Sequence, residues 1–341
     1  MIKALGKNPS GTRLKRIIKS PNYKHGTFQN LLPTEVTLKN ASFIRMMKDF
    51  INKPKLTVPG NSLPSVRSNL KDLHAEHPTI VWFGHSSYFI QFKNFKILVD
   101  PVFSGNASPF SFFGKAFKGA DIYHADDFDE IDLLIITHDH YDHLDYKTIQ
   151  ELHEKVKSII APLGVGSHLE YWNVPNEKIT ELDWWESHLV NEQIRITATP
   201  SRHFSGRTFI RNKTLWASFV LDMLPYKIFI GGDSGYDTTF KTIGEEFGPF
   251  DIAILEAGQY GKDWPYIHMF PQQTVQASID LQARYLLPVH WSKFSLSLHL
   301  WNEPIKRVFE EAEKRSMRLT TPMIGEFVVL DKIYPADTWW R

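Results

Sequence analysis

Short apolar runs separated by turn residues characterise the chain from about residue 79 onward. Three of them follow one another at 79–83, 88–92 and 96–100, and they are rich in the β-branched and aromatic residues that strands prefer. Gly84 and the Lys93-Asn94 pair separate these runs and predict the turns. The pattern therefore predicts a meander of three strands at the start of the regular structure.

Strand-like and helix-like segments alternate through the rest of the chain. Strands are predicted at 131–137, 158–161, 194–198, 215–221, 226–230, 251–255, 285–289 and 326–330, and helices at 145–157, 238–247, 271–282 and 303–315. A meander followed by alternating elements favours an α/β (α+β) architecture, in which two mixed sheets pack face to face with helices outside.

The first 76 residues differ from the rest, and we expect them to form an N-terminal arm before a main domain at 77–341. No stretch has the apolar core of a secretory signal or the length of a membrane span. The basic residues that precede the first acidic residue, Glu35, are Lys3, Lys7, Arg13, Lys15, Arg16, Lys19 and Lys24.

Two interpretations of this arm stay open. Its basic cluster predicts either a solvated, partly ordered arm, which we favour, or a weak contact with anionic lipid headgroups. Its apolar residues could pack on the core or touch lipid; they are Phe28, Leu31, Leu32, Phe43, Ile44, Met46, Met47, Phe50 and Ile51. We expect a cytoplasmic protein, and peripheral membrane contact through the arm is the open alternative.

Composition is that of an ordinary globular protein. Hydrophobic residues make up 42% and charged residues 23% of the 341 residues, and the formal net charge is +1. This balance gives no argument for nucleic acid as a partner. The chain has no cysteine. Disulfides and thiolate ligands are therefore excluded, and any metal must be held by histidine and carboxylate.

The strongest chemical signal is the run from Thr137 to His143, which ends a predicted strand and precedes a predicted helix. Its four potential ligands, at the rim of a sheet, are His138, His140, Asp142 and His143. Imidazole suits zinc and similar borderline metals, and a carboxylate can support a second ion. Two histidines alone would indicate only a polar turn, but four potential ligands this close together predict a metal site.

Three more residues of ligand type follow predicted strands. His203 lies just past the strand at 194–198, Asp233 follows the Gly231-Gly232 pair, and His290 directly follows the strand at 285–289. Small glycines let a backbone approach a crowded site. For each residue alone, a satisfied polar group in the core is the simpler interpretation. Together with the run at 137–143, they predict further ligands.

The run at 137–143 resembles the metal motif of the metallo-β-lactamase superfamily, whose fold is an αββα sandwich. Blocks between Trp82 and Pro304 resemble the N-acylphosphatidylethanolamine-hydrolysing phospholipase D subgroup; they lie at 97–104, 107–110, 215–219, 232–236, 247–251 and 290–294. The resemblance implies His138, His140 and His203 as ligands of one metal, Asp142, His143 and His290 as ligands of the other, and Asp233 as a bridge.

The resemblance also implies residues that surround the metals. His85 would lie near them, shaping the rim or meeting the substrate, and Asp100 would orient a ligand histidine through its other ring nitrogen. His268 would face the phosphate of the substrate. The aromatic residues near it would either line an apolar pocket or pack in the core; they are Trp264, Tyr266 and Phe270.

We therefore expect a dinuclear zinc hydrolase that attacks a phospholipid-type phosphodiester through a hydroxide bridging two Zn²⁺ ions. Asp142, Asp233 and His268 would be its catalytic residues. Histidine at 143, where the oxidoreductase branch of the superfamily usually has a carboxylate, implies zinc over iron, with Mn²⁺ or Fe as alternatives. The alternative function is a lactonase or another ester hydrolase, because one fold hosts many chemistries. A metal-stabilised binding protein is less favoured, because structural zinc sites are usually closed and mononuclear.

Overall fold

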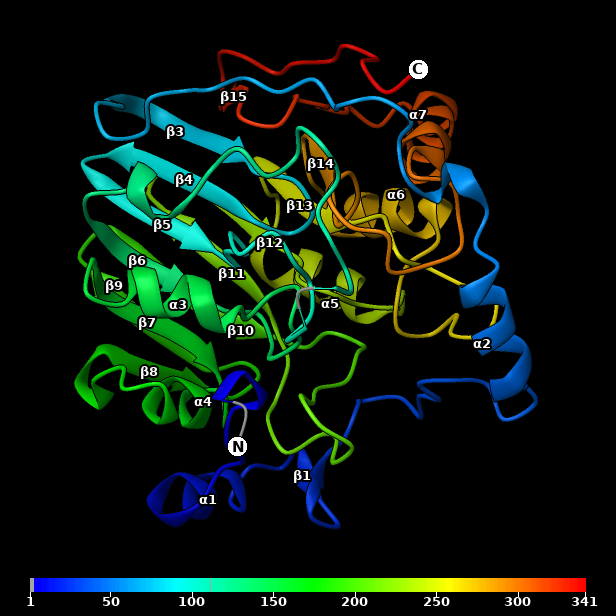
Figure 1. Ribbon diagram of the computed structural model, residues 1–341. Coiled ribbons are helices and arrows are strands. Elements are labelled where there is room, and N and C mark those ends of the chain that lie inside the picture. The colour runs from blue at the N-terminus through cyan, green and yellow to red at the C-terminus, as the bar shows by residue number, and fades with distance from the viewer. Residues whose placement is uncertain (1–2, 111) are drawn as a thin grey trace.

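The computed structural model describes residues 3–110 and 112–341, which form two β-sheets stacked face to face (Figure 1). The first sheet has seven strands in the order β15-β3-β4-β5-β6-β7-β8. The second has six strands in the order β14-β13-β12-β11-β10-β9.

The strands of the first sheet are β3 (Ala75–Trp82), β4 (Tyr88–Lys93), β5 (Phe95–Val99), β6 (Ile131–Ile135), β7 (Val156–Pro162), β8 (Ile179–Leu182) and β15 (Phe327–Val329). Those of the second are β9 (Ser187–Asn191), β10 (Ile194–Thr199), β11 (Ser218–Met223), β12 (Tyr226–Ile230), β13 (Ile252–Glu256) and β14 (Leu286–Val289). The α-helices after residue 100 are α3 (Tyr146–Leu152), α4 (Gly166–Tyr171), α5 (Thr239–Phe247), α6 (Pro271–Asp280) and α7 (Glu303–Arg315).

Both sheets are mixed in the same way. In the first sheet the strands from β15 to β5 pair antiparallel, and those from β5 to β8 pair parallel. In the second sheet the strands from β9 to β12 pair antiparallel, whereas β12, β13 and β14 pair parallel. The carboxyl ends of parallel strands meet at one edge of a sheet, and such edges are where open α/β sheets bind ligands.

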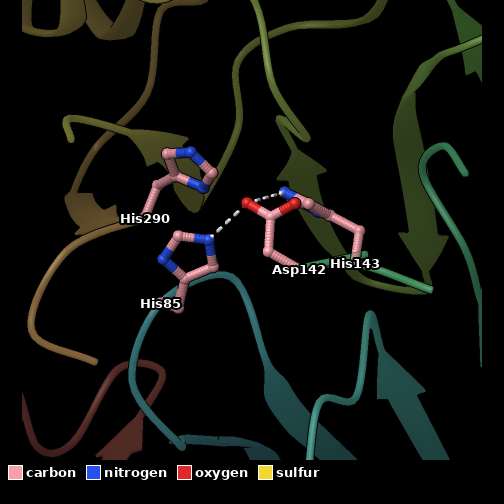
Figure 2. Close-up of side chains that lie close together, drawn as sticks. All are labelled: His85, Asp142, His143 and His290. Atoms are coloured by element: carbon pink, nitrogen blue, oxygen red, sulfur yellow. Dashed lines mark hydrogen bonds and ion pairs between the residues drawn. The ribbon is translucent and has the colours of Figure 1, made fainter. Parts of the chain in front are cut away.

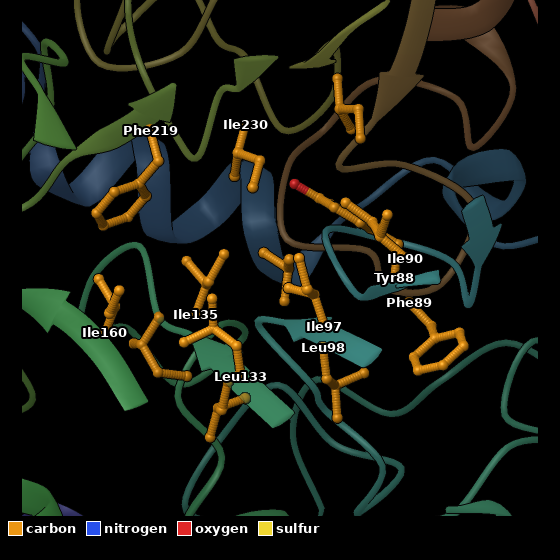
Figure 3. Packing of buried hydrophobic residues seen from close by; sticks show 14 of the residues in the cluster. Tyr88, Phe89, Ile90, Ile97, Leu98, Leu133, Ile135, Ile160, Phe219 and Ile230 are labelled. Carbon is orange, nitrogen blue, oxygen red and sulfur yellow. The ribbon is translucent and has the colours of Figure 1, made fainter. Parts of the chain in front are cut away.

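Apolar side chains of the two sheets pack against each other in the core between them (Figure 3). Ile97, Leu133 and Ile135 of the first sheet face Phe219 and Ile230 of the second, and all five are buried. A second apolar cluster joins the second sheet to α5, α6 and α7. Full burial of one such side chain stabilises the fold by about 1.5–3 kcal/mol. The predicted sandwich with outer helices is confirmed.

The predicted elements differ from the observed ones in several places: helix α4 was not expected, and the strand expected over 215–221 is observed as β11 at Ser218–Met223. The helix expected over 145–157 ends at Leu152, and Val156 instead begins β7, where it pairs with Ile131. A single apolar residue at helical spacing cannot be told from the first residue of a strand. Strands β8 and β9 were not expected. β9 is a short edge strand with alternating half-burial, and its sequence lacks a continuous apolar run.

The N-terminal segment packs on the main body instead of forming a solvated arm. Ile17, at the end of α1 (Gly11–Ile17), and Phe28, in β2 (Thr27–Phe28), are fully buried, and β2 pairs with β1 (Tyr23–Lys24). Nε1 of Trp172 donates a hydrogen bond to the carbonyl oxygen of Lys3 at 2.8 Å. The favoured expectation of a solvated arm is wrong for residues 3–28, because apolar anchors hold them. Residues 1–2 lie outside the described residues, and the boundary at residue 76 stays a prediction.

The later part of this segment crosses to another side of the molecule, where α2 (Phe43–Ile51) lies (Figure 1). Arg45 of α2 forms an ion pair with the buried Asp263, and the backbone nitrogen of Leu38 donates to the carbonyl oxygen of Asp263 at 2.9 Å. Nζ of Lys53 donates to the carbonyl oxygen of Ser295 at 2.8 Å. These contacts hold α2 beside the loops that follow β13 and β14. None of the described helices has the length and apolarity needed to cross a bilayer.

Candidate metal centre

The metal-motif loop, residues 137–143, begins where β6 ends, and Asp100 fixes its first residue. Asp100 follows β5, the parallel neighbour of β6, and is buried. Its Oδ1 accepts a hydrogen bond from the backbone nitrogen of Thr137 at 2.8 Å, and its Oδ2 accepts one from Oγ1 of Thr137 at 2.5 Å. The loop is thereby held at the sheet edge, and His138 and His143 are buried.

The first cluster of possible metal ligands combines His138, His140, His203 and Asp233, each of which offers an atom within 4.8 Å of the others. Nδ1 of His140 lies 2.9 Å from Nε2 of His138 and 3.2 Å from Nε2 of His203. Oδ2 of Asp233 lies 3.7 Å from both of those Nε2 atoms. Candidate ligands from the loops that follow β6, β10 and β12 therefore converge on one point.

The second cluster combines His85, Asp142, His143 and His290 (Figure 2). Oδ2 of Asp142 lies 2.9 Å from Nε2 of His85 and 3.8 Å from Nε2 of His143. The rings of His85 and His290 lie 4.0 Å apart. His85 is thus part of this cluster, and the sequence had suggested for it only a place at the rim or near the substrate.

Asp233 lies between the two clusters. Its Oδ2 faces the first cluster, while its Oδ1 lies 3.2 Å from Nε2 of His143 and 3.1 Å from Nδ1 of His290. The structure therefore brings all seven residues of the predicted ligand set together. The carboxylate of Asp233, for which the resemblance implies a bridging role, has one oxygen toward each cluster.

Several buried polar atoms in this region lack a hydrogen-bond partner among the described residues. They include Nε2 of His143 and Oδ1 of Asp233, which lie 3.2 Å apart. Most buried polar atoms in proteins are paired, so a group of converging unpaired atoms requires an explanation. Imidazole nitrogens and carboxylate oxygens are the donor set that zinc and similar ions prefer. The two clusters are therefore suited to bind metal.

The electrostatics of the site agree with this reading. Burial lowers the pKa of His138, His203 and His290 well below the usual range, so these imidazoles are neutral, which is the form that ligates metals. Burial also acts on His143, but the negative charges of Asp233 and other carboxylates raise its pKa well above the usual range. The arrangement therefore favours positive charge among its carboxylates.

The second ring nitrogen of the ligand histidines is held by other parts of the chain. Nδ1 of His143 lies 2.7 Å from Oδ2 of Asp100, and Nδ1 of His203 donates to the carbonyl oxygen of Ile267 at 2.8 Å. With Nδ1 carrying a hydrogen in both rings, the neutral form of each imidazole directs the lone pair of Nε2 at the cluster. Asp100 thus contacts a ligand histidine in the way that the sequence predicts.

Asp139 lies between His138 and His140 in the sequence, and its side chain bonds to other parts of the chain and holds the metal-motif loop in place. It is buried, its Oδ1 accepts from the backbone nitrogen of Gly206 at 2.7 Å, and its Oδ2 lies 3.1 Å from Nε2 of His168. Nη1 of Arg207 donates to the carbonyl oxygens of Asp139 and Leu144 at 2.7 Å each. These contacts restrict the backbone on both sides of the ligands.

A cleft of about 270 Å³ opens onto both clusters. One of its walls carries the ligands, and the other walls carry apolar and cationic side chains. The residues that line it include His140, Asp142, Asp233 and His290 from the clusters, Met46 and Phe50 from α2, and Phe204, Arg211, Trp264, Ile267, His268 and Leu296 from the loops. The N-terminal segment therefore forms part of the site, which the sequence did not indicate.

His268 lies in the cleft wall, as the resemblance implied, and its ring is stacked on that of His290 at 5.2 Å between centroids. Of the nearby aromatic residues, Trp264 lines the cleft. Tyr266 instead packs on the guanidinium of Arg202, and Phe270 packs on Tyr260. The prediction of an apolar pocket wall therefore applies to Trp264.

Glu256, which the sequence analysis missed, lies directly behind His268. It is fully buried at the end of β13, and its Oε2 lies 3.0 Å from Nδ1 of His268. Burial raises the pKa of Glu256. Burial alone would lower the pKa of His268, but the negative charge of Glu256 more than reverses that effect and raises it. The signal was present, because a carboxylate ends an otherwise apolar strand.

Known proteins resemble this chain in sequence and in fold. A model of the Beta-lactamase superfamily domain matches residues 96–291, the stretch that contains all seven predicted ligands. An uncharacterised protein of Mycobacterium tuberculosis is 36% identical over 327 residues, which cover 94% of this chain and 88% of that protein. The N-acyl-phosphatidylethanolamine-hydrolyzing phospholipase D 1 of Caenorhabditis elegans is 28% identical over 270 residues, covering 75% of this chain and 76% of that protein.

A solved structure shows the same fold. The metallo hydrolase Igni18 of Ignicoccus hospitalis superposes with a TM-score of 0.57 at 17% sequence identity, covering 75% of this chain and 99% of its own. At this level of identity the likeness concerns the arrangement of sheets and helices alone.

Proposed function

The chain belongs to the metallo-β-lactamase superfamily and is a metal-dependent hydrolase, and we propose that it works with a pair of divalent ions, with zinc favoured. His138, His140 and His203 would hold one ion, and Asp142, His143 and His290 the other. The observation that supports a pair is Asp233, whose two carboxylate oxygens face different clusters. A shared carboxylate offsets the repulsion between two neighbouring cations.

The chemistry that such a pair supplies is activation of water near neutral pH and polarisation of the bond under attack. The chain contributes orientation. His85 holds the carboxylate of Asp142 at 2.9 Å, and Asp100 holds the ring of His143 at 2.7 Å. Since buried residues fix both side chains, the ligands are in place before a substrate binds, which lowers the cost of reorganisation during the reaction.

We propose a phosphodiester, of the phospholipid type, as the substrate. The observation that carries this proposal is His268, a ring that lines the cleft next to the ligand wall and is backed by a buried carboxylate. A phosphodiester brings a negatively charged oxygen to this wall, and that charge grows during attack. A hydrogen bond to an ionised group is stronger than one to a neutral group. A lactone is uncharged and gains less from such a donor.

The rest of the cleft agrees with an amphipathic substrate. Arg211 adds a positive charge to the lining of the cleft, which also contains His268. Met46, Phe50 and Leu296 give the cleft an apolar side. The similarity to the Caenorhabditis elegans protein, which is named as an N-acyl-phosphatidylethanolamine-hydrolyzing phospholipase D, points to the same substrate class.

The test combines metal analysis with turnover of a phosphodiester, a lactone and a β-lactam. We expect His268→Ala to keep its metal content and fold but to lose phosphodiester turnover by about 10²–10³, the usual effect of removing one preorganised donor. His299→Ala is a matched control, because His299 packs on Tyr260 outside the cleft lining. Lactone hydrolysis without phosphodiester hydrolysis by the wild type would replace this proposal with a lactonase. Bound metal without any turnover would indicate a binding protein.

We further propose that the protein makes peripheral contact with phospholipid surfaces through α2. Phe43, Ile44 and Ile51 lie on the outer side of this helix and are 72%, 80% and 77% exposed. A neighbouring stripe of the same helix lines the cleft through Met46 and Phe50. An amphipathic helix of this kind can lie in the headgroup region with its apolar side buried. The contact would bring the cleft to the surface that holds the substrate.

The basic residues near the N-terminus are less suited to this contact. Arg13 forms ion pairs with Glu181 and Glu170, and Arg16 pairs with Glu186. Their charge is therefore partly neutralised by the main body. We place the membrane contact of the N-terminal segment at α2 and not at its basic cluster.

Vesicle binding tests this assignment. The double substitution Ile44→Asp and Ile51→Asp should abolish sedimentation with phosphatidylethanolamine–phosphatidylglycerol vesicles, because it places two charges on the apolar face. Ile18→Asp is the control, since Ile18 is also exposed, at 61%, but follows α1 on another side of the molecule (Figure 1). Equal vesicle binding by both variants and the wild type would contradict the assignment.

A further inference from the structure

We propose that Glu256 is a positioning residue, which fixes the ring of His268 so that one nitrogen is aimed into the cleft as a donor for an anionic substrate. This proposal rests on the proposed function, because that function makes His268 a donor to the substrate. It adds a residue on the far side of His268 from the cleft, and it explains how this chain keeps the donor in place.

Glu256 ends the middle one of three neighbouring parallel strands, β12, β13 and β14. The flanking strands lead into Asp233 and His290, so the three strand ends present two predicted ligands with a carboxylate between them. Glu256 lies next to Val289, the residue before His290, in the sheet register. The register therefore places its side chain beside the ligand wall of the cleft.

Both oxygens of this carboxylate are used inside the protein. Oε1 accepts from the backbone nitrogens of Met269 at 3.0 Å and Ser234 at 3.2 Å, and Oε2 lies 3.0 Å from Nδ1 of His268. A fully buried carboxylate is costly unless such donors compensate it. The acceptors are therefore occupied, and the role that fits Glu256 is to hold these donors.

The contact with Glu256 decides which way His268 can act. A carboxylate accepts hydrogen bonds, so Nδ1 of His268 carries a hydrogen and is committed to Glu256. Nε2 is then the ring atom that a substrate can reach. Stacking on His290, with 22° between the ring planes, and an edge contact with His203 limit rotation of the ring. The donor direction is set before the substrate arrives.

Glu256 also joins the two walls of the cleft. Ser234 directly follows Asp233, and Met269 directly follows His268, and the same Oε1 accepts from both backbones. One side chain thus fixes the spacing between the turn that carries a ligand and the loop that carries the donor. A phosphodiester must meet both walls at once, so the spacing decides how well its anionic oxygen is held.

The experiment is a double-mutant cycle on the metal-loaded full chain. Glu256→Gln keeps the size of the side chain but loses its charge. We expect it to keep wild-type metal content and to lose phosphodiester kcat by about 10–100-fold, the range found when a metal-ligating histidine loses its orienting partner. In the His268→Ala background it should cause no further loss, because Glu256 acts through His268.

Glu181→Gln is the matched control. Glu181 is also buried in a strand, accepts from the backbone nitrogens of Gly164 and Gly166, and pairs with one cation, Arg13. It does not line the cleft. This variant should lose stability but keep kcat, which separates loss of a buried carboxylate from loss of the donor.

A readout without substrate separates this inference from the proposed function. The ring ¹⁵N signals of His268, identified by their absence in His268→Ala, should shift in Glu256→Gln and stay in place in Glu181→Gln. Should the wild type hydrolyse no phosphodiester, that shift would still support the positioning role. Unchanged signals, an additive loss in the double variant, or loss of metal from Glu256→Gln would each overturn it. If Glu256→Gln does not fold, Glu256→Asp, whose carboxylate is withdrawn from His268, should give the same shift.

Discussion

Replacement of Asp100 by alanine tests whether the cluster around His143 binds metal. Asp100 is buried and accepts hydrogen bonds from the backbone nitrogen of Thr137, from Oγ1 of Thr137 and from Nδ1 of His143, at 2.8, 2.5 and 2.7 Å. A hydrogen bond to a charged group contributes about 1.5–3 kcal/mol, and breaking a buried pair costs about 3–5 kcal/mol. Since the three contacts share one side chain, we expect a loss of about 3–5 kcal/mol in the unfolding free energy of the metal-free protein.

The effect on metal affinity is a separate expectation. Without Asp100 the ring of His143 can turn, and its Nε2 is no longer directed at Asp233. Loss of such an orienting partner usually lowers metal affinity by about 10–100-fold. Competition between the protein and a chromogenic chelator measures this affinity, and urea unfolding in excess chelator measures stability without metal.

A neighbouring variant separates the two effects. Ser87→Ala removes a buried hydroxyl that donates to the carbonyl oxygen of Asp100 at 2.7 Å and accepts from the backbone nitrogen of Val102 at 3.1 Å. It should cost about 1–3 kcal/mol of stability, because a buried donor and acceptor lose their partner. It touches no ligand histidine and should keep wild-type metal affinity. If Asp100→Ala also binds zinc as tightly as the wild type, Asp100 supports the fold alone and the reasoning about His143 is refuted.

Two further predictions concern charge. Asp233→Asn should lose hydrolysis and at least one metal per chain by elemental analysis, because an amide cannot offer two anionic oxygens to both clusters; wild-type metal content would contradict the paired site. Burial lowers the pKa of Lys53 to about 8, from 10.5 for a free side chain, so between these values the unfolded chain binds more protons and the unfolding free energy should rise with pH. Urea unfolding below and above this window should show that rise relative to Lys53→Met, and parallel curves for the two proteins would contradict it.

The parts of the site that follow from local sequence could be predicted. The run at 137–143 contains four predicted ligands in seven residues, and its short spacing alone indicates that they lie near one another at the turn after β6. Asp233 and His290 could be inferred because parallel strands end at a common edge. The same rule applies to Glu256. The apolar pattern predicts a strand only as far as Leu255, one position before Glu256, so it does not indicate this carboxylate.

The contribution of the N-terminal segment could not be predicted, because it depends on contacts between residues far apart in the chain. The side-chain amide of Asn30 exchanges two hydrogen bonds with the backbone of His203, at 2.7 and 3.0 Å. The pattern of residues 43–51 indicates an amphipathic helix, but it does not say that one face meets a cleft built from β6, β12 and β14. His85 is a comparable case. The resemblance implies that it lies near the metals, but the sequence does not predict its 2.9 Å contact with Asp142.

The cleft is built from two parts of the sequence. All seven predicted ligands lie within residues 96–291, the part that matches the superfamily model, and they are held at the ends of strands in a packed sandwich. Met46 and Phe50, which form part of the apolar side of the cleft, lie before that part. Relatives that share only the matched domain can therefore share the metal chemistry while a different segment covers the cleft. One fold supports many reactions in this way, because the loops that line the cleft can change while the residues of the predicted metal site stay the same. The substrate of this protein is consequently better judged from α2 and the pair of His268 and Glu256 than from the metal ligands.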